Sequence, residues 1–213
     1  MDLRRNYASF DDILGAIKCG SPVLVFDEHK EQEADLIVAI ETVQPETVTF
    51  MLRHGSGLLC AALLKSRLAQ LGIPALPPMN RRDDTPFHYP VDAVAAAHDM
   101  ALNGTSSVSA VGRWMTARMF IDPQANNNWF VSPGHLVVLG AQDKLLEARR
   151  GHTEASVTLA KLSGLYPAAL LTEVLSNNGK MAEPDELVTF SKTYRIPITS
   201  IVHIAENAVH LVR

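Results

Sequence analysis

The sequence predicts a single domain of the α/β or α+β class that spans residues 1–213. Segments with helical and strand patterns are interspersed along the chain without a repeating period, and no linker divides them. About six segments have the pattern of strands. The 47% of hydrophobic residues among 213 is enough for a core that buries roughly 70% of the surface of the unfolded chain.

Local signals define the elements of the first half. In "SFDDILGAIKCG", Ser9 is a candidate N-cap, apolar residues follow on one helical face, and Gly20 ends the helix. A second helix is expected to begin near Pro45 and to stop at Gly55. Strands are expected at "PVLVF", "DLIVAI" and "LLCAALL", with a short helix at "KSRLAQLG".

The second half begins with "IPALPPMNRRDDTPFHYP", which is rich in proline and charge and is predicted to be a mobile excursion that could act as a lid. "SSVSAVGRWMTARMFID" is expected to be helical in its second half, and "HLVVLGA" to be a strand. "TEASVTLAKLSGL" has the pattern of an amphipathic helix with Thr153 as its cap. "AALLTEVL" is a candidate strand, "PDELVTFSKTYRI" a helix and "PITSIVHI" the last strand.

The composition argues against several classes of protein. A net charge of -4 and a pI near 6.0 give no basic footprint for nucleic acid or for a membrane surface. The N-terminus lacks the apolar core of a signal peptide, and no apolar stretch reaches the roughly 18 residues of a membrane span. The only two cysteines, Cys19 and Cys60, do not suggest a disulfide or zinc framework, so a cytoplasmic location is expected.

The stretch "FDEHKEQEADL" gathers carboxylates between two predicted strands. Glu28 and His29 are expected to lie in a solvated turn. Glu31, Glu33 and Asp35 are spaced by two, so an extended backbone would place them on one face, where a cation or a basic ligand must offset their repulsion. Oxygen ligands of this kind suit Mg²⁺.

"RRGHTEAS" places Arg149, Arg150, Gly151, His152 and Thr153 at the start of a predicted helix. Free backbone N–H groups, the helix dipole, a guanidinium and a hydroxyl would meet there, and this combination suits a phosphate. The alternative is an ordinary capped helix, but basic side chains at a helix N-terminus oppose the dipole. His152 is a candidate metal ligand, with a structural or acid–base role as the alternative.

Three further residues stand out. His135 follows a Pro-Gly pair, and the expectation is that it projects from the mouth of a strand into a cleft as a general acid or base. Glu173 is a carboxylate inside an apolar run, which is either suited to proton transfer or faces water from an edge strand. Cys60 is most simply a small buried hydrophobe.

Five motifs lie in order along the chain: "DEHKEQEAD", "RHGSGLLC", "SPGH", "RRGHTEAS" and "TEVLSNNGKMA". With them the sequence resembles the 3,4-dihydroxy-2-butanone 4-phosphate synthase family of riboflavin biosynthesis over nearly its whole length. The resemblance implies a three-layer α/β homodimer that binds Mg²⁺, or Mn²⁺ in its place, and ribulose 5-phosphate at the dimer interface and releases one carbon as formate.

The resemblance also implies roles for individual residues. The metal ligands would be Glu31 and His152. The catalytic set would be Glu31, Asp35, Cys60, His135 and Glu173. Substrate binding would fall to Lys30, Ser106, Arg149, Gly151, His152 and Thr153.

The sequence departs from the family pattern within these motifs, at Lys30, Gln32, Ala34, His88, Ser107, Gly112 and Ser132. Three hypotheses follow. The chain has the family activity with tolerated substitutions, or it is a divergent paralogue that acts as a lyase or isomerase on another sugar phosphate, or it is a catalytically silent dimer that binds a phosphosugar or a protein partner. Retention of Glu31, His135, His152 and Glu173 argues against the silent dimer.

Overall fold

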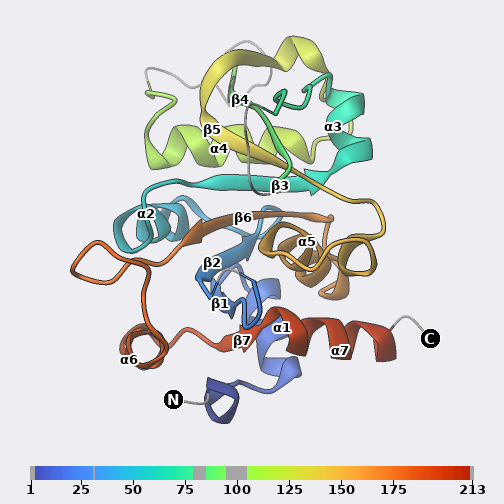
Figure 1. The fold of residues 1–213 in the computed structure, drawn as a ribbon. Helices are drawn as coiled ribbons and strands as arrows, with labels where there is room; N and C mark the ends of the chain where they lie inside the picture. The colour runs from blue at the N-terminus through green and yellow to red at the C-terminus, as the bar shows by residue number, and fades with distance from the viewer. Residues whose placement is uncertain (1–2, 31, 79–84, 95–104, 212–213) are drawn as a thin grey trace.

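The computed structural model describes residues 3–30, 32–78, 85–94 and 105–211 and contains a seven-stranded sheet (Figure 1). The strand order is β4-β5-β3-β6-β2-β1-β7, from the top to the bottom of Figure 1. The sheet is mixed, because β1 pairs in parallel with β7, and β3 with β5, while the remaining pairs are antiparallel. The strands are β1 Val23–Phe26, β2 Ala34–Ala39, β3 Cys60–Leu64, β4 Phe87–Ala93, β5 Phe130–Ala141, β6 Ala168–Glu173 and β7 Ile198–Ser200.

Helices cover both faces of the sheet, so the domain has three layers, as expected. One hydrophobic cluster packs α2, α3, α4 and α6 against the first face, and the other packs α1, α5 and α7 against the second. The helices are α1 Phe10–Lys18, α2 Pro45–His54, α3 Lys65–Leu71, α4 Ala110–Phe120, α5 His152–Leu162, α6 Pro184–Tyr194 and α7 Ile201–Leu211. Short 3₁₀ turns lie at Leu3–Asn6, Asn127–Trp129 and Leu145–Glu147. Within the described residues, no helix has both the length and the apolarity that a membrane span requires.

Local sequence signals explain the elements that were predicted correctly. The Ser9 side chain accepts a hydrogen bond from the backbone N–H of Asp12 and caps α1. Gly20 follows that helix with φ +72°, a conformation that costs glycine little. Pro45 opens α2, and the backbone of Gly55 closes it through a hydrogen bond to the Met51 carbonyl. Each of these signals acts within a few residues, so it can be read from the sequence.

Several predictions were wrong. The proline-rich stretch is not one long excursion, because Phe87 onward forms β4, although residues 79–84 lie outside the described part of the chain. The last predicted strand ends at Ser200 and is followed by α7, since Ile201 and Ile204 bury one helical face. Gly151, rather than Thr153, is the N-cap of α5, and this helix is buried from His152 to Ala160 instead of being amphipathic.

The predicted strand "HLVVLGA" is the second half of a longer one, because β5 begins at Phe130. Pro133 and Gly134 therefore lie within β5 and not in a turn before it. A Cβ at Gly134 would lie 2.1 Å from the carbonyl carbon of Val91 on β4, so the close pairing of the two strands requires glycine there. The pairing shifts register between His88 and Asp92, where Pro90 lacks a backbone donor.

Candidate active site

A pocket of about 430 Å³ opens where the central strands of the sheet meet the start of α5. Strands β2, β3 and β6 supply Asp35, Cys60 and Glu173 to it, and the beginning of α5 supplies His152 and Thr153. The other lining residues are Lys30, Glu33, Thr85, Phe87, Leu139, Arg149 and Leu171. Residues more than 100 positions apart in the sequence therefore form one site.

The register of the sheet brings two carboxylates together in this pocket. Asp35 on β2 lies directly opposite Glu173 on β6, and directly opposed residues point to the same face. Asp35 is 4% exposed, whereas Glu173 ends its strand and is half-buried. β6 is a central strand, so the alternative of an edge-strand Glu173 that faces water is wrong.

Cys60 lies beside this pair on β3 and is buried, as the sequence indicated. Burial, followed by the nearby charges of Glu173 and Asp35, raises the pKa of the Cys60 thiol. The thiol is therefore protonated at neutral pH. It contributes shape and a weak donor to the pocket rather than a thiolate nucleophile.

Glu173 has a hydrogen-bond partner that was not predicted. The Ser56 hydroxyl donates to Glu173 Oε2 at 2.7 Å, and the Ser56 backbone N–H donates to the Glu173 carbonyl oxygen at 2.7 Å. Ser56 lies in the "RHGSGLLC" motif, in the connection between α2 and β3. The motif singled out this connection, but the role of the serine depends on a contact across 117 positions of sequence.

His152 is the first residue of α5 and is 6% exposed. Its Nε2 lies 3.1 Å from the Val25 carbonyl oxygen, which can only accept, so Nε2 carries a proton. In the neutral ring, Nδ1 then carries the lone pair, and it lies 3.9 Å from Asp35 Oδ1. A proton or a cation between these two atoms would offset the repulsion of their electron pairs.

Arg149 lines the same pocket, and its charge is offset inside the protein. Its Nη1 donates to Oε2 of the fully buried Glu154 at 2.6 Å, and the other oxygen of Glu154 accepts from the Gln142 backbone. Glu154 in the first turn of α5 therefore already compensates the charge of Arg149, so the presence of Arg149 at this helix start does not by itself require a bound anion. A Cβ at Gly151 would lie 2.2 Å from the Arg149 guanidinium, so glycine leaves room for this packing.

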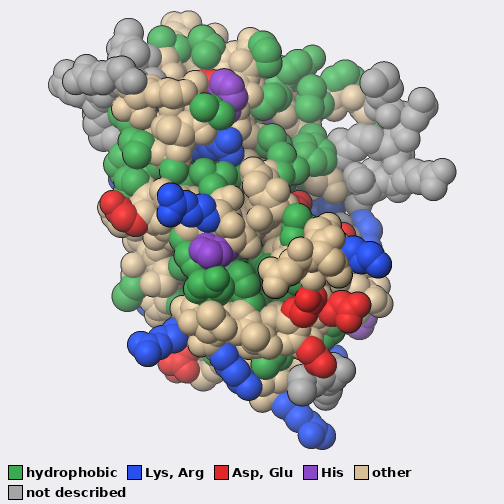
Figure 2. All heavy atoms as spheres, turned by 90° about the vertical axis from the view of Figure 1, so that its left-hand side faces the viewer, with side chains coloured by type: hydrophobic (Ala, Val, Ile, Leu, Met, Phe, Trp, Pro, Cys, Tyr) green, Lys and Arg blue, Asp and Glu red, His purple; other side chains and the backbone are tan. Residues whose placement is uncertain are grey.

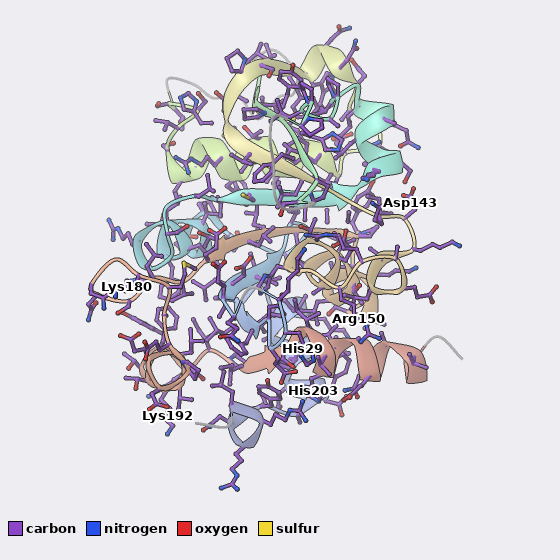
Figure 3. All side chains as sticks on the ribbon, in the orientation of Figure 1. His29, Asp143, Arg150, Lys180, Lys192 and His203 are labelled. Carbon is purple, nitrogen blue, oxygen red and sulfur yellow. The ribbon has the colours of Figure 1, made fainter. Side chains whose placement is uncertain are left out.

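The acidic stretch supplies Lys30, Glu33 and Asp35 to the pocket, and Glu31 lies outside the described residues. Glu28, expected in a solvated turn, is instead partly buried, and its Oε1 accepts from the Tyr7 hydroxyl at 2.7 Å. His29 is exposed, as expected (Figure 3). Gln32 has a left-handed backbone with φ +54°, whereas Ala34 is the first residue of β2, so Ala34 does not need the freedom of glycine.

His135 is not at the mouth of a strand. It lies within β5, its Nδ1 is 2.6 Å from Asp92 Oδ2 on β4, and its side chain is 51% exposed. The Asp92 carboxylate thus fixes the orientation of the ring and leaves Nε2 directed outward. Neither His135 nor the exposed Ser106 is among the residues that line the pocket within the described part of this chain.

The residues around the pocket fit a divalent cation only in part. Among the described residues, no three His, Cys, Asp or Glu side chains are placed to hold a metal ion, and this set excludes Glu31. The lone pair on His152 Nδ1 nevertheless faces the buried Asp35 carboxylate, and Glu33 lines the same pocket. One nitrogen and several carboxylate oxygens suit a hard divalent cation that keeps part of its water shell.

Comparisons with known proteins agree with the fold and the motifs. The family model for 3,4-dihydroxy-2-butanone 4-phosphate synthase matches residues 11–207. The synthase of Cupriavidus pinatubonensis is 38% identical over 193 residues, which are 90% of this chain and 83% of that protein. The riboflavin biosynthesis protein RibBA of Aquifex aeolicus is 36% identical over 200 residues, or 93% of this chain and 48% of that protein.

The chain therefore spans about half the length of some curated relatives. Among solved structures, a 3,4-dihydroxy-2-butanone 4-phosphate synthase in complex with two magnesium ions superposes with a TM-score of 0.82 at 33% sequence identity. The likeness covers 93% of this chain and 95% of that one.

Proposed function

Because the chain belongs to the 3,4-dihydroxy-2-butanone 4-phosphate synthase family, we propose that it converts D-ribulose 5-phosphate to 3,4-dihydroxy-2-butanone 4-phosphate and formate. Five carbons are divided between a four-carbon phosphate and formate, with no oxidant required. The observation that carries the proposal is the pairing of Asp35 and Glu173 opposite His152 and Arg149 in one pocket.

The charged and polar side chains of the pocket supply the groups that this reaction needs. Arg149 and Thr153, at the start of α5, bind the phosphate together with the backbone N–H groups of the first helical turn. Asp35 and Glu173 accept hydrogen bonds from substrate hydroxyls, and Glu173 moves protons between carbon and oxygen. Lys30 adds a positive charge at the pocket mouth, where it neutralises part of the charge of the bound phosphate.

We assign a divalent cation, Mg²⁺ or Mn²⁺, to His152 Nδ1 and the carboxylates of the acidic stretch, including Glu31. A cation held by these residues would supply Lewis-acid polarisation of the ketone and a neighbouring hydroxyl of the substrate. The Val25 carbonyl oxygen supports this role, because it holds the proton of His152 on Nε2 and so keeps the Nδ1 lone pair directed toward Asp35.

Three of the seven substitutions relative to the family pattern lie outside the pocket that this chain forms, and their position favours the family reaction over a changed one. His88 is buried beneath β5, where its Nε2 would lie 2.4 Å from a Cβ at Gly140. Ser132 is exposed and donates to the Pro90 carbonyl oxygen. Gly112 packs against the backbone of Ser106. None of these is among the pocket-lining residues of the described chain, whereas Lys30 is.

The direct test is to incubate the protein with ribulose 5-phosphate and Mg²⁺ and to measure formate with formate dehydrogenase. We expect formate and the four-carbon phosphate in equal amounts, loss of the reaction with EDTA, and recovery when Mg²⁺ is added back. Ribose 5-phosphate, which has no ketone, should release no formate. If saturating Mg²⁺ and substrate yield no formate from well-folded protein, the proposed function is wrong.

We further propose that the protein acts as a homodimer in which His135 reaches the partner's pocket. His135 and Glu173 share a face of the sheet, but two strand spacings, roughly 10 Å, separate their backbones, and Asp92 holds the His135 ring toward β4. Hydrophobic side chains gather toward the β4–β5 end of the face in Figure 2. Exposed hydrophobic residues include Val131 on β5, Val108 just before α4 and Leu58 just before β3.

Mixing two inactive variants tests the shared site. His135→Ala and Glu173→Gln are each expected to be inactive, but in a mixed dimer one of the two sites combines native His135 with native Glu173. Random reassortment makes half of the dimers mixed, so about one quarter of the parent activity should return after unfolding and refolding the two variants together. Recovery no greater than the sum of the separate variants would show that each site is formed by a single chain.

A further inference from the structure

We propose that Ser56 is a positioning residue that fixes the Glu173 carboxylate for proton transfer. This inference rests on the proposed function, because it assigns Ser56 a role only through Glu173. Ser56 itself lies behind the carboxylate and is not one of the described residues that line the pocket. Its contribution is therefore expected in the chemical step rather than in substrate binding.

Two hydrogen bonds connect Ser56 to the same residue. The hydroxyl donates to Glu173 Oε2 at 2.7 Å, and the backbone N–H donates to the Glu173 carbonyl oxygen at 2.7 Å. The main chain and the carboxylate of Glu173 are thus held from one side by one serine. Because the serine occupies Oε2, Oε1 is the oxygen that Glu173 presents to the substrate.

The connection that carries Ser56 is packed tightly. A Cβ at Gly55 would lie 2.5 Å from the Thr172 side chain, so glycine lets this connection approach β6 closely. The Ser56 oxygen also accepts from the Leu58 backbone N–H at 3.2 Å and lies 3.3 Å from the Thr172 hydroxyl. These contacts restrict the serine to the orientation that reaches Glu173.

The end of α2 is fixed by an aromatic cluster on the opposite side. His54 lies 4.7 Å from the ring of Tyr194 on α6 and 4.5 Å from the ring of Phe50, and its Nδ1 is 3.2 Å from the Tyr194 hydroxyl. The helix end cannot shift without disturbing these contacts. The Ser56 hydroxyl is therefore held in place before substrate binds, as a preorganised catalytic group requires.

A freely rotating carboxylate would reach the reactive geometry in only part of its conformations. Glu173 is half-buried at a strand end, so its own backbone does not restrict its last torsion angles. A hydrogen bond to a charged acceptor is strong enough to select one orientation, and its loss corresponds to roughly a tenfold to hundredfold change in a rate that depends on it.

The test compares Ser56→Ala with Ser56→Thr and with Ser66→Ala. Ser66 is a matched control, because its hydroxyl donates to Asp143 Oδ1 at 2.7 Å at the opposite end of β3 (Asp143 is labelled in Figure 3). We expect Ser56→Ala to lower kcat for formate release at least about tenfold with KM changed less than about twofold. Ser56→Thr, which keeps the hydroxyl, should restore most of kcat, and Ser66→Ala should match the parent.

The outcomes separate this inference from the proposed function. If the parent releases no formate, the proposed function fails. If the parent is active and Ser56→Ala has the parent's kcat, only the role of Ser56 fails. An increase in KM with kcat unchanged, or equal losses in Ser56→Ala and Ser56→Thr, would also overturn the role. If Ser56→Ala does not fold, Ser56→Thr and Ser56→Cys test the role of Ser56 instead. Ser56→Cys has a weak thiol donor and is expected to lower kcat, whereas Ser56→Thr keeps the hydroxyl and is expected to retain most of kcat.

Discussion

Replacing Glu173 by glutamine is expected to lower kcat for formate release by about 1000-fold or more, which is within the range of a lost general acid–base group. Glutamine has nearly the same size as glutamate, and its carbonyl oxygen can still accept from the Ser56 hydroxyl, which donates to Glu173 Oε2 at 2.7 Å. The variant should therefore keep the geometry of the pocket and lose only the ability to take up a proton. Initial rates of formate release at saturating Mg²⁺ measure the effect.

The control for this prediction is Glu46→Gln, which makes the same change in the exposed first turn of α2. It should keep the parent activity. Circular dichroism and the midpoint of thermal unfolding establish that Glu173→Gln is folded. A folded Glu173→Gln protein that retains more than about one tenth of the parent kcat would exclude proton transfer by this residue.

Much of the fold could be predicted because its signals are local. The cap at Ser9 and the limits of α2 at Pro45 and Gly55 each depend on contacts over a few residues, and the structure confirms them. The alternation of helices and buried strands gave the fold class for the same reason. The order of strands in the sheet was beyond such reasoning, because it depends on pairing between distant segments.

Two predictions of secondary structure were wrong because tertiary packing overrides the local sequence pattern. "PITSIVHI" has the β-branched residues of a strand, yet Ile201 and Ile204 are buried at helical spacing and start α7. Thr153 has the side chain of an N-cap, but the extended backbone needed at that position falls on Gly151. In both cases the correct answer is set by packing against the second face of the sheet.

The sequence singled out several residues of the candidate site, but it did not predict which residues they contact. Asp35 was selected from the spaced carboxylates of the acidic stretch, His152 from the start of a predicted helix, and Glu173 as a carboxylate inside an apolar run. The structure places all three around one pocket. Their partners lie far away in sequence. Asp92 contacts His135 across 43 positions, and Ser56 contacts Glu173 across 117. No pattern within a window of sequence reports such pairs.

Removing the imidazole of His152 is expected to weaken Mg²⁺ binding at least about 100-fold, since the loss of a ligand should cost as much as the larger effects seen for its hydrogen-bonded neighbours. His152→Gln is the sharper variant, because its amide can still donate to the Val25 carbonyl oxygen, which lies 3.1 Å from Nε2 in the parent. Calorimetric titration with Mg²⁺, without substrate, measures this effect independently of activity.

His29→Ala is the matched control, because His29 is an exposed histidine in the same acidic stretch (Figure 3). If the metal is held between the acidic stretch and the start of α5, His29→Ala binds Mg²⁺ like the parent, whereas His152→Gln does not. The physical reason is the position of the proton on the His152 ring. The Val25 carbonyl oxygen fixes this proton on Nε2, so Nδ1 can only accept. Nδ1 lies 3.9 Å from Oδ1 of the buried Asp35 carboxylate. Equal Mg²⁺ affinity in all three proteins would show that His152 is not a ligand of the cation.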